Sequence, residues 1–314
     1  MPPIHPTTKP CLILLIVISS CTAELTAEEW QAENFAKAVN QNNSSHASLL
    51  KSGICTGSMK ISMAPLHEPS LKTVLDCDFR IAFVGEKIRL ERSYNLNRLK
   101  SEHQPGAWGL ENPECSSSVL IANGSNNYWV RRIAGGPTKC MKLIPAWREL
   151  LLGNFDCPAH HPIRIWETAS RPLQDDDLRF RLTNLSSGGF IARGQGGNWS
   201  ATCTYDSANP ACLNRVAIYE ERSLIMEHNL QWEESNGKRY VSDYSLAARK
   251  PIGGEPARLR LRIQYNEFQA NAAVSDDEFQ PGSLGVPEGT VFEQNAPFPK
   301  KFVLKGAQLV PVPR

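Results

Sequence analysis

Hydrophobic and polar residues alternate along much of the chain with the period of a β-strand. Between residues 71 and 83 most odd positions are apolar, whereas Asp76, Asp78 and Arg80 occupy even positions. A strand places successive side chains on opposite faces of a sheet, so this segment predicts a half-buried strand. Turn residues rather than helical segments follow it, which indicates antiparallel pairing. The same alternation recurs in residues 87–94, 178–182, 226–233 and 258–265.

Two segments predict helices that would cover the apolar side of this sheet. Thr26-Ala-Glu-Glu29 forms a capping box, and apolar residues follow at helical spacing as far as Val39. Residues 145–153 begin with proline and end with glycine, as short helices do. The predicted fold class is therefore α+β: a large curved antiparallel sheet, or half-barrel, with an N-terminal helix and a few short helices on its concave face. Asn236-Gly237 predicts a two-residue hairpin turn.

The N-terminal segment predicts export. An apolar run from Cys11 to Ile18 follows Lys9 and precedes small residues, which is typical of a signal peptide over residues 1–23. The run is shorter than the roughly 20 apolar residues of a membrane-spanning helix. Residues 18–21 resemble a lipobox, which would make Cys21 a lipidated N-terminus and a tether to a membrane surface. Cleavage before Glu24 is the alternative and would leave a periplasmic protein.

The remaining chain predicts one folded domain and a tail. Residues 24–296 form the domain, with an insertion near residues 140–212 that contains glycine-rich turns. Residues 297–314 contain several prolines and predict an extended tail.

Composition and charge exclude several classes of protein. Hydrophobic residues make up 41% of the 314 positions, as in globular proteins. Lys and Arg number 34 against 32 Asp and Glu, without a clustered basic excess, so no nucleic-acid partner is predicted. The nine cysteines favour disulfides in an oxidising compartment. Cys203 and Cys212 flank a turn and are the candidate pair.

Sequence patterns for catalysis and metal binding fail one by one. Cys157-Pro-Ala-His160-His161 lacks the second half of a zinc site, so no metal site is predicted. Ser283 lies in Gly-Ser-Leu-Gly, which lacks the spacing of a nucleophile elbow. The residues Arg89, Glu91 and Arg92 fit outward cross-strand ion pairing better than a buried charge site. A non-enzymatic protein is therefore predicted, and a hydrolase with a dispersed site near His160 and His161 stays open.

Several segments, in this order and behind an export signal, carry a family resemblance. They are Gly53–Met59, Asp78–Arg89, Asn236–Tyr240, Val274–Phe279 and Val286–Val291. Over roughly residues 26–295 the chain resembles the LolA-like lipoprotein-carrier superfamily, as a divergent bacterial exported member. The resemblance implies that an acyl chain of a lipid or lipoprotein binds in an apolar hollow between a curved sheet and helices, without a cofactor.

The inward strand positions supply the candidate cavity residues. An apolar hollow fits the usual way in which proteins hold small apolar ligands. An envelope scaffold or interaction module, with the same face filled by side chains, is the alternative. The cavity candidates are Phe79, Ile81, Phe83, Leu90, Met226, Trp232 and Leu261.

Overall fold

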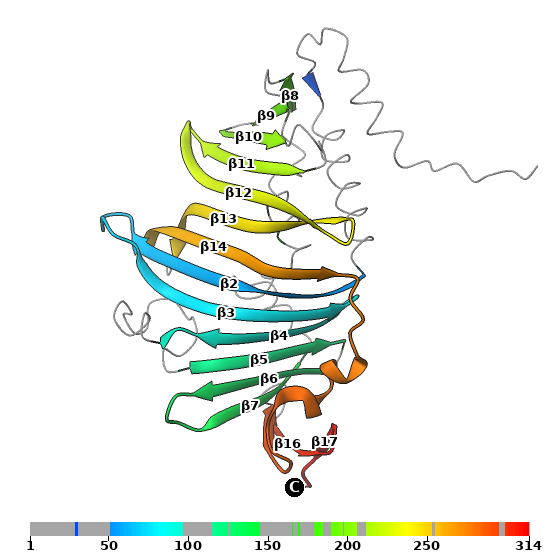
Figure 1. Cartoon of the computed structure of the whole chain (residues 1–314). Coiled ribbons are helices and arrows are strands. Elements are labelled where there is room, and N and C mark those ends of the chain that lie inside the picture. Colours follow the sequence, from blue (N-terminus) through cyan, green and yellow to red (C-terminus); the bar gives the residue numbers. More distant parts are fainter. Residues whose placement is uncertain are drawn as a thin grey trace, which may run out of the picture.

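One extended β-sheet contains most of the described residues (Figure 1). The computed structural model describes residues 29–30, 51–96, 115–124, 126–144, 165, 169, 179–184, 190–196, 198–205, 212–252, 255–294 and 299–313. Figure 1 shows the long central strands bending along their length. The predicted signal peptide, including Cys21, lies outside the described residues.

The sheet contains seventeen strands. Each strand pairs antiparallel with its neighbours, except that β7 and β15 are parallel. In spatial order the strands are β1 (Glu29–Trp30), β8 (Arg179–Asn184), β9 (Phe190–Gly196), β10 (Trp199–Tyr205), β11 (Leu213–Glu220), β12 (Ser223–Ser235), β13 (Lys238–Ile252), β14 (Glu255–Ala270), β2 (Ser52–Pro65), β3 (Lys72–Val84), β4 (Lys87–Tyr94), β5 (Cys115–Asn123), β6 (Asn126–Ile133), β7 (Thr138–Leu143), β15 (Val291–Gln294), β16 (Lys300–Lys305) and β17 (Gln308–Pro311).

The strands expected from alternation are confirmed. Strands β3, β4, β8, β12 and β14 cover the five alternating segments, and β4 has the expected bounds. The hairpin between β12 and β13 is also confirmed, because Ser235 pairs with Lys238 across a two-residue turn. Asn236 and Gly237 both have positive φ, 51° and 70°. This backbone matches the right-handed twist of the two strands.

The two central strands come from distant parts of the chain. Strand β2 pairs with β14 from Gly53 opposite Ala270 to Pro65 opposite Ala257. Close approach of the two backbones requires glycine at position 57, because a Cβ there would lie 2.2 Å from the carbonyl oxygen of Gln264. The contact between β2 and β14 joins the meander β2–β7 to the strands β8–β14.

The α+β fold class is wrong, because the described residues are nearly all sheet. No helix of seven or more residues occurs among them, and the helical elements with described bounds are the 3-10 helices η4 (Asp276–Phe279) and η5 (Pro281–Leu284). Glu29 and Trp30, expected in the N-terminal helix, pair with Arg181 and Phe180 of β8. Pairing at the sheet edge therefore overrides the local capping signal there. The rest of that segment and residues 145–153 lie outside the described residues.

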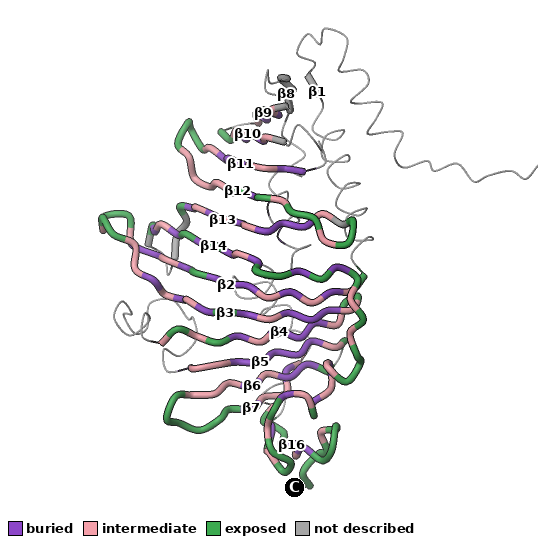
Figure 2. The backbone as a smooth tube through the Cα atoms, viewed as in Figure 1, coloured by how far each residue is buried: buried purple, intermediate pink, exposed green. Residues whose placement is uncertain are grey.

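The two faces of the sheet carry separate apolar clusters. The apolar face is the one formed by the odd residues of β2 and β3, and its cluster also includes Ile165 and Ala169 from the segment between β7 and β8. The outer face is the opposite one. Figure 2 shows buried positions recurring along the central strands between more exposed ones.

On the outer face, a C-terminal segment (residues 274–313) covers strands β4–β7. Its Phe279, Phe292 and Phe302 are 0–7% exposed and pack with Ile121 and Val130. Residues 300–311 of the predicted tail form the hairpin β16–β17 within this segment. Within the described ranges, no helix combines the length and hydropathy needed to cross a membrane.

Candidate functional site

The structure brings the seven candidate cavity residues together in one apolar cluster. Phe79, Ile81 and Phe83 of β3 are 1–4% exposed, and Leu90 of β4 and Leu261 of β14 are 2–3% exposed. Met226 and Trp232 of β12 are half-buried and pack against the same cluster. The alternation of apolar and polar residues along single strands therefore selected side chains that lie on one common surface. Five of the seven side chains are fully packed, and two lie at its margin.

Four large half-buried side chains pack against the apolar cluster at two places. Met226 and Trp232 belong to β12, and Trp129 and Met141 belong to β6 and β7. Trp232 is fixed by a hydrogen bond of 3.0 Å from its Nε1 to the carbonyl oxygen of Leu213. Methionine side chains are flexible and polarisable, so these positions can adapt to ligands of different shape. We call these four residues the apolar rim.

A basic row that the sequence analysis missed crosses the apolar face beside this rim. Arg92 of β4 lies opposite Ser118 of β5, and Ser118 lies opposite Arg131 of β6. Arg92 and Ser118 are buried, with 6% and 3% exposure. The hydroxyl groups of Ser118 and Tyr94 are 3.0 Å apart. The guanidinium of Arg131 stacks over the Trp129 ring at 4.8 Å.

The interpretation of all three charged residues of β4 as outward ion pairs is therefore only partly right. Arg89 and Glu91 do lie on the outer face, where Arg89 Nε is 2.6 Å from Glu91 Oε1. Arg92 has the same parity as Ile88 and Leu90, and it lies on the apolar face with them. This parity is the sequence signal that could have placed Arg92 inward.

On the outer face, arginines hold the C-terminal segment against the sheet. Arg80 donates two hydrogen bonds to the carboxylate of Glu278, at 2.9 and 3.1 Å. This pairing lowers the pKa of Glu278 below its usual value. Arg89 donates to Ser283 Oγ and to the carbonyl oxygen of Glu278. Ser283, considered above as a nucleophile, thus has a structural contact to the sheet.

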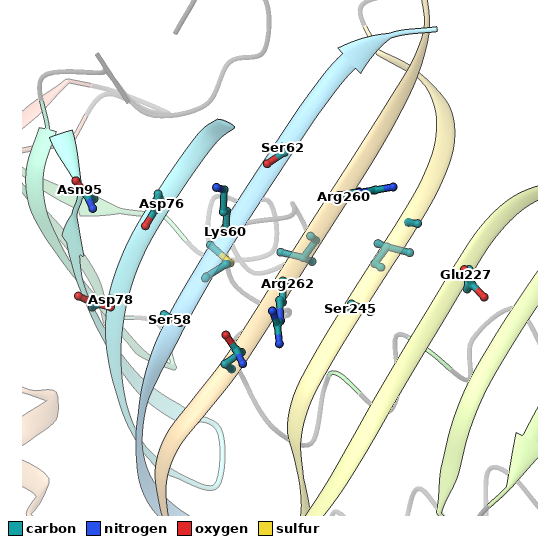
Figure 3. Close-up of a pocket in the computed structure, with 15 residues that line it drawn as sticks. Ser58, Lys60, Ser62, Asp76, Asp78, Asn95, Glu227, Ser245, Arg260 and Arg262 are labelled. Atoms are coloured by element: carbon teal, nitrogen blue, oxygen red, sulfur yellow. The ribbon is translucent and has the colours of Figure 1, made fainter. Parts of the chain in front are cut away.

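A polar trough of about 680 Å³ lies on the outer face over strands β12, β13, β14, β2 and β3 (Figure 3). Lys60, Arg260 and Arg262 project from the central strands, with Asp76 and Asp78 on the neighbouring β3. Arg262 Nη2 lies 2.7 Å from Oδ2 of Asp243, a residue that does not itself line the trough. The trough is therefore a surface of mixed charge with a basic centre.

One histidine is buried beneath the apolar face. His228 of β12 is 1% exposed and lies between Val216 of β11 and Leu246 of β13. Its Nδ1 is 2.9 Å from the hydroxyl of Tyr244, and its Nε2 has no hydrogen-bond partner. Burial lowers the pKa of His228 to about 4, so the ring is neutral at pH 7.

No disulfide joins any two of the six cysteines that the structure describes, and all six are buried. The candidate pair Cys203–Cys212 is therefore not formed. Tyr205 lies opposite Leu213, which displaces Cys203 from Cys212 by about three residues, or roughly 10 Å, along the strands. A disulfide requires Cα atoms within about 7 Å. Burial raises the pKa of the Cys55 and Cys203 thiols, so both are protonated.

The remaining candidates for chemistry lie outside the described residues. They are Cys157, His160 and His161. Among the residues that are described, no group of three or more His, Cys, Asp or Glu side chains could hold a metal ion.

Comparisons with known proteins show a distant likeness of fold. No family model matches the sequence, and no curated protein does. A crystal structure of a DUF1329 family protein from Desulfovibrio piger is 8% identical, with a TM-score of 0.39, and the match covers 79% of this chain and 98% of that one. A complex structure of Pseudomonas aeruginosa MucA/MucB gives 9% identity and a TM-score of 0.27, covering 85% of this chain and 75% of the other. At these values the likeness carries no argument about ligands or partners.

Proposed function

We propose that this chain is an exported, non-enzymatic protein that binds an acyl chain of a lipid or lipoprotein on its apolar face. The single observation that carries the proposal is the apolar cluster with its rim. Seven positions from four strands meet in one cluster, and the four large half-buried side chains of the apolar rim pack against it. Apolar surface with an accessible margin is what an acyl chain requires for entry and burial.

The expected binding energy is compatible with such a ligand. Each methylene group removed from water contributes about 0.8 kcal/mol. A buried run of about 12 methylene groups would therefore contribute roughly 10 kcal/mol before the entropic cost of association. Met141 and Met226 at the rim can change rotamer to admit the chain without unfolding the sheet.

The first test is mass spectrometry of organic extracts from the form that begins at Glu24, purified from a bacterial periplasm and compared with a mock purification. We expect a stoichiometric acyl lipid in the extract. In parallel, a fatty acid should displace an apolar fluorescent dye from the delipidated protein. An extract without lipid, together with no uptake of the dye, would overturn the proposal.

A rim variant locates the site. Met226→Gln adds a polar group at a half-buried position, and we expect weaker dye binding with little change in melting temperature. Phe83→Glu is less informative, because Phe83 is 1% exposed and a buried carboxylate there would unfold the cluster. The matched control is Leu66→Gln in the turn after β2, which is 44% exposed and lies outside the apolar rim. Equal dye affinity in the folded Met226→Gln variant would contradict this placement.

The second candidate function is an envelope scaffold or interaction module, and the polar trough favours it. Lys60 and Arg260 are exposed at the centre of the trough, where a partner surface could contact them. A photo-crosslinking residue at position 60 should then capture one envelope protein, whereas the same residue at Val310 on β17 should not. Lipid-free protein with such a partner would favour this function over acyl binding.

A further inference from the structure

We infer that the apolar face carries an anion-binding site, formed by Arg92, Ser118 and Arg131 with Tyr94, that receives the phosphate or carboxylate head group of the bound amphiphile. This inference rests on the proposed acyl-binding function and specifies its ligand class. The ligand would be an anionic lipid, with its acyl chain over the apolar cluster and its head group over the basic row.

The strand register places the two arginines in one row of the apolar face. Arg92, Ser118 and Arg131 are direct neighbours across β4, β5 and β6 and lie on the same face. Neighbouring strands are about 4.8 Å apart, so the two arginine Cα atoms are roughly 10 Å apart. Arginine side chains are long enough to meet above the serine between them. The Ser118 hydroxyl, 3.0 Å from that of Tyr94, lies at the floor of this position.

Two hydrogen-bond donors of Arg131 are unpaired. Its Nε and Nη2 atoms are buried and have no hydrogen-bond partner among the residues that the structure describes. In the part of the chain that the structure describes, no carboxylate lies within ion-pair distance of Arg131. Buried donors without acceptors are rare and costly, and charged ones most of all. A phosphate or carboxylate would satisfy both atoms with charge-assisted, bidentate hydrogen bonds.

The opposite face of the same strand shows how this protein treats an arginine whose role is structural. Arg89 is 8% exposed, and it contacts the carboxylates of Glu91 and Glu278 as well as Ser283. At Arg89, burial is therefore accompanied by acceptors from the chain itself. Among the described residues, the Nε and Nη2 atoms of Arg131 have no such acceptor, which points to an acceptor supplied by a ligand.

The basic row adjoins the surface that would hold the acyl chain. Phe79 lies directly opposite Arg92 in the β3–β4 pair. Leu90, Trp129 and Met141 belong to the next row on the same face, two residues along their strands. Two residues of a strand span about 7 Å, so a head group at the arginines leaves its chain on the apolar cluster.

The test compares anionic and uncharged ligands of matched chain length on the full mature protein. Oleate is compared with oleyl alcohol, and phosphatidic acid with diacylglycerol, by displacement of an apolar dye at pH 7.5. We expect at least tenfold tighter binding of one or both anionic members than of the uncharged partner. Preference for oleate alone identifies a carboxylate head group, and preference for phosphatidic acid identifies a phosphate.

Substitution of Arg131 separates this inference from the proposed function. Arg131→Gln should reduce the preference for the anionic member of each pair to less than threefold. Arg131→Lys keeps the charge but not the bidentate geometry, so an intermediate preference is expected. The control Arg260→Gln removes one cation from the outer face and should keep the full preference.

The outcomes are distinct. Equal binding of charged and uncharged lipids would overturn the anion site and leave acyl binding intact. A preference that survives Arg131→Gln would also overturn the assigned site. Binding of none of the four ligands would instead refute the proposed function itself.

Discussion

The buried histidine makes the stability of this protein depend on pH in a defined direction. Burial lowers the pKa of His228 to about 4, whereas the unfolded chain has the ordinary value of 6.5. Between these two values the unfolded state binds a proton that the folded state does not. Stability is therefore full above pH 6.5 and is lost as the pH falls toward 4.

The size of the loss follows from the two pKa values. Between pH 7.5 and pH 5.0, His228 should lower the free energy of unfolding by about 2 kcal/mol. The neighbours of the ring offer no compensation, because Val216 and Leu246 flank it across the sheet and its polar contact is the Tyr244 hydroxyl. The substitution His228→Phe removes the titrating group at similar volume.

Urea unfolding monitored by circular dichroism at several pH values between 7.5 and 5.0 measures the effect. We expect the loss of stability over this range to be about 2 kcal/mol smaller in His228→Phe than in the wild type. Other titrating groups contribute equally to both proteins, so the difference isolates His228. Parallel pH profiles for the wild type and His228→Phe would refute the reasoning.

Three further outcomes test the packing of the sheet. Gly57→Ala should destabilise the protein by more than about 2 kcal/mol, because the new Cβ meets the backbone of β14, whereas Ser58→Ala should change it by less than about 0.5 kcal/mol in the same urea assay. Glu278→Gln should cost about 1–3 kcal/mol through its two hydrogen bonds with arginine, while the exposed Glu293→Gln should cost almost nothing. Peptide mapping after iodoacetamide treatment should show Cys55 labelled only in the unfolded protein.

Strands with one solvent-exposed face were predictable from sequence, and strands with both faces buried were not. In β3 the alternation of apolar and charged residues matches the observed burial. In β5 the run from Val119 to Ala122 is buried on both faces, because the C-terminal segment covers the outer one. Such a strand loses its alternation and reads as a continuous apolar run. The covering element comes from residues far along the chain, so local sequence could not reveal it.

The helix prediction failed for a related reason. A capping box describes a local preference of a few tenths to about 1 kcal/mol, and pairing with a sheet edge can exceed it. Glu29 and Trp30 take part in such pairing with β8, which is about 150 residues later in the chain. The expected disulfide failed because proximity in sequence does not fix the register of β10 against β11.

The candidate site was half predictable. Parity along single strands was enough to group Phe79, Leu90 and Leu261, since each strand orients its own residues. The basic row required knowing that β5 lies between β4 and β6, because Arg92 and Arg131 are 39 positions apart and meet only through Ser118. Residues of one strand can be assigned from sequence, whereas a site that crosses three strands needs the order of the sheet.

The arrangement of charges on β4 separates stability from binding. On the outer face, Arg89 is paired with acceptors of the chain itself. Its contacts therefore stabilise the packing of the C-terminal segment against the sheet. On the apolar face, the neighbouring basic row includes buried donors of Arg131 that have no acceptor within the described ranges. A β-sheet can carry a fully paired arginine on one face and an arginine with unpaired donors on the other face, within a few ångströms. This is possible because successive residues of a strand point to opposite faces. The C-terminal segment therefore packs against the outer face of strands β4–β6, and the anionic ligand that we propose would bind on their other face.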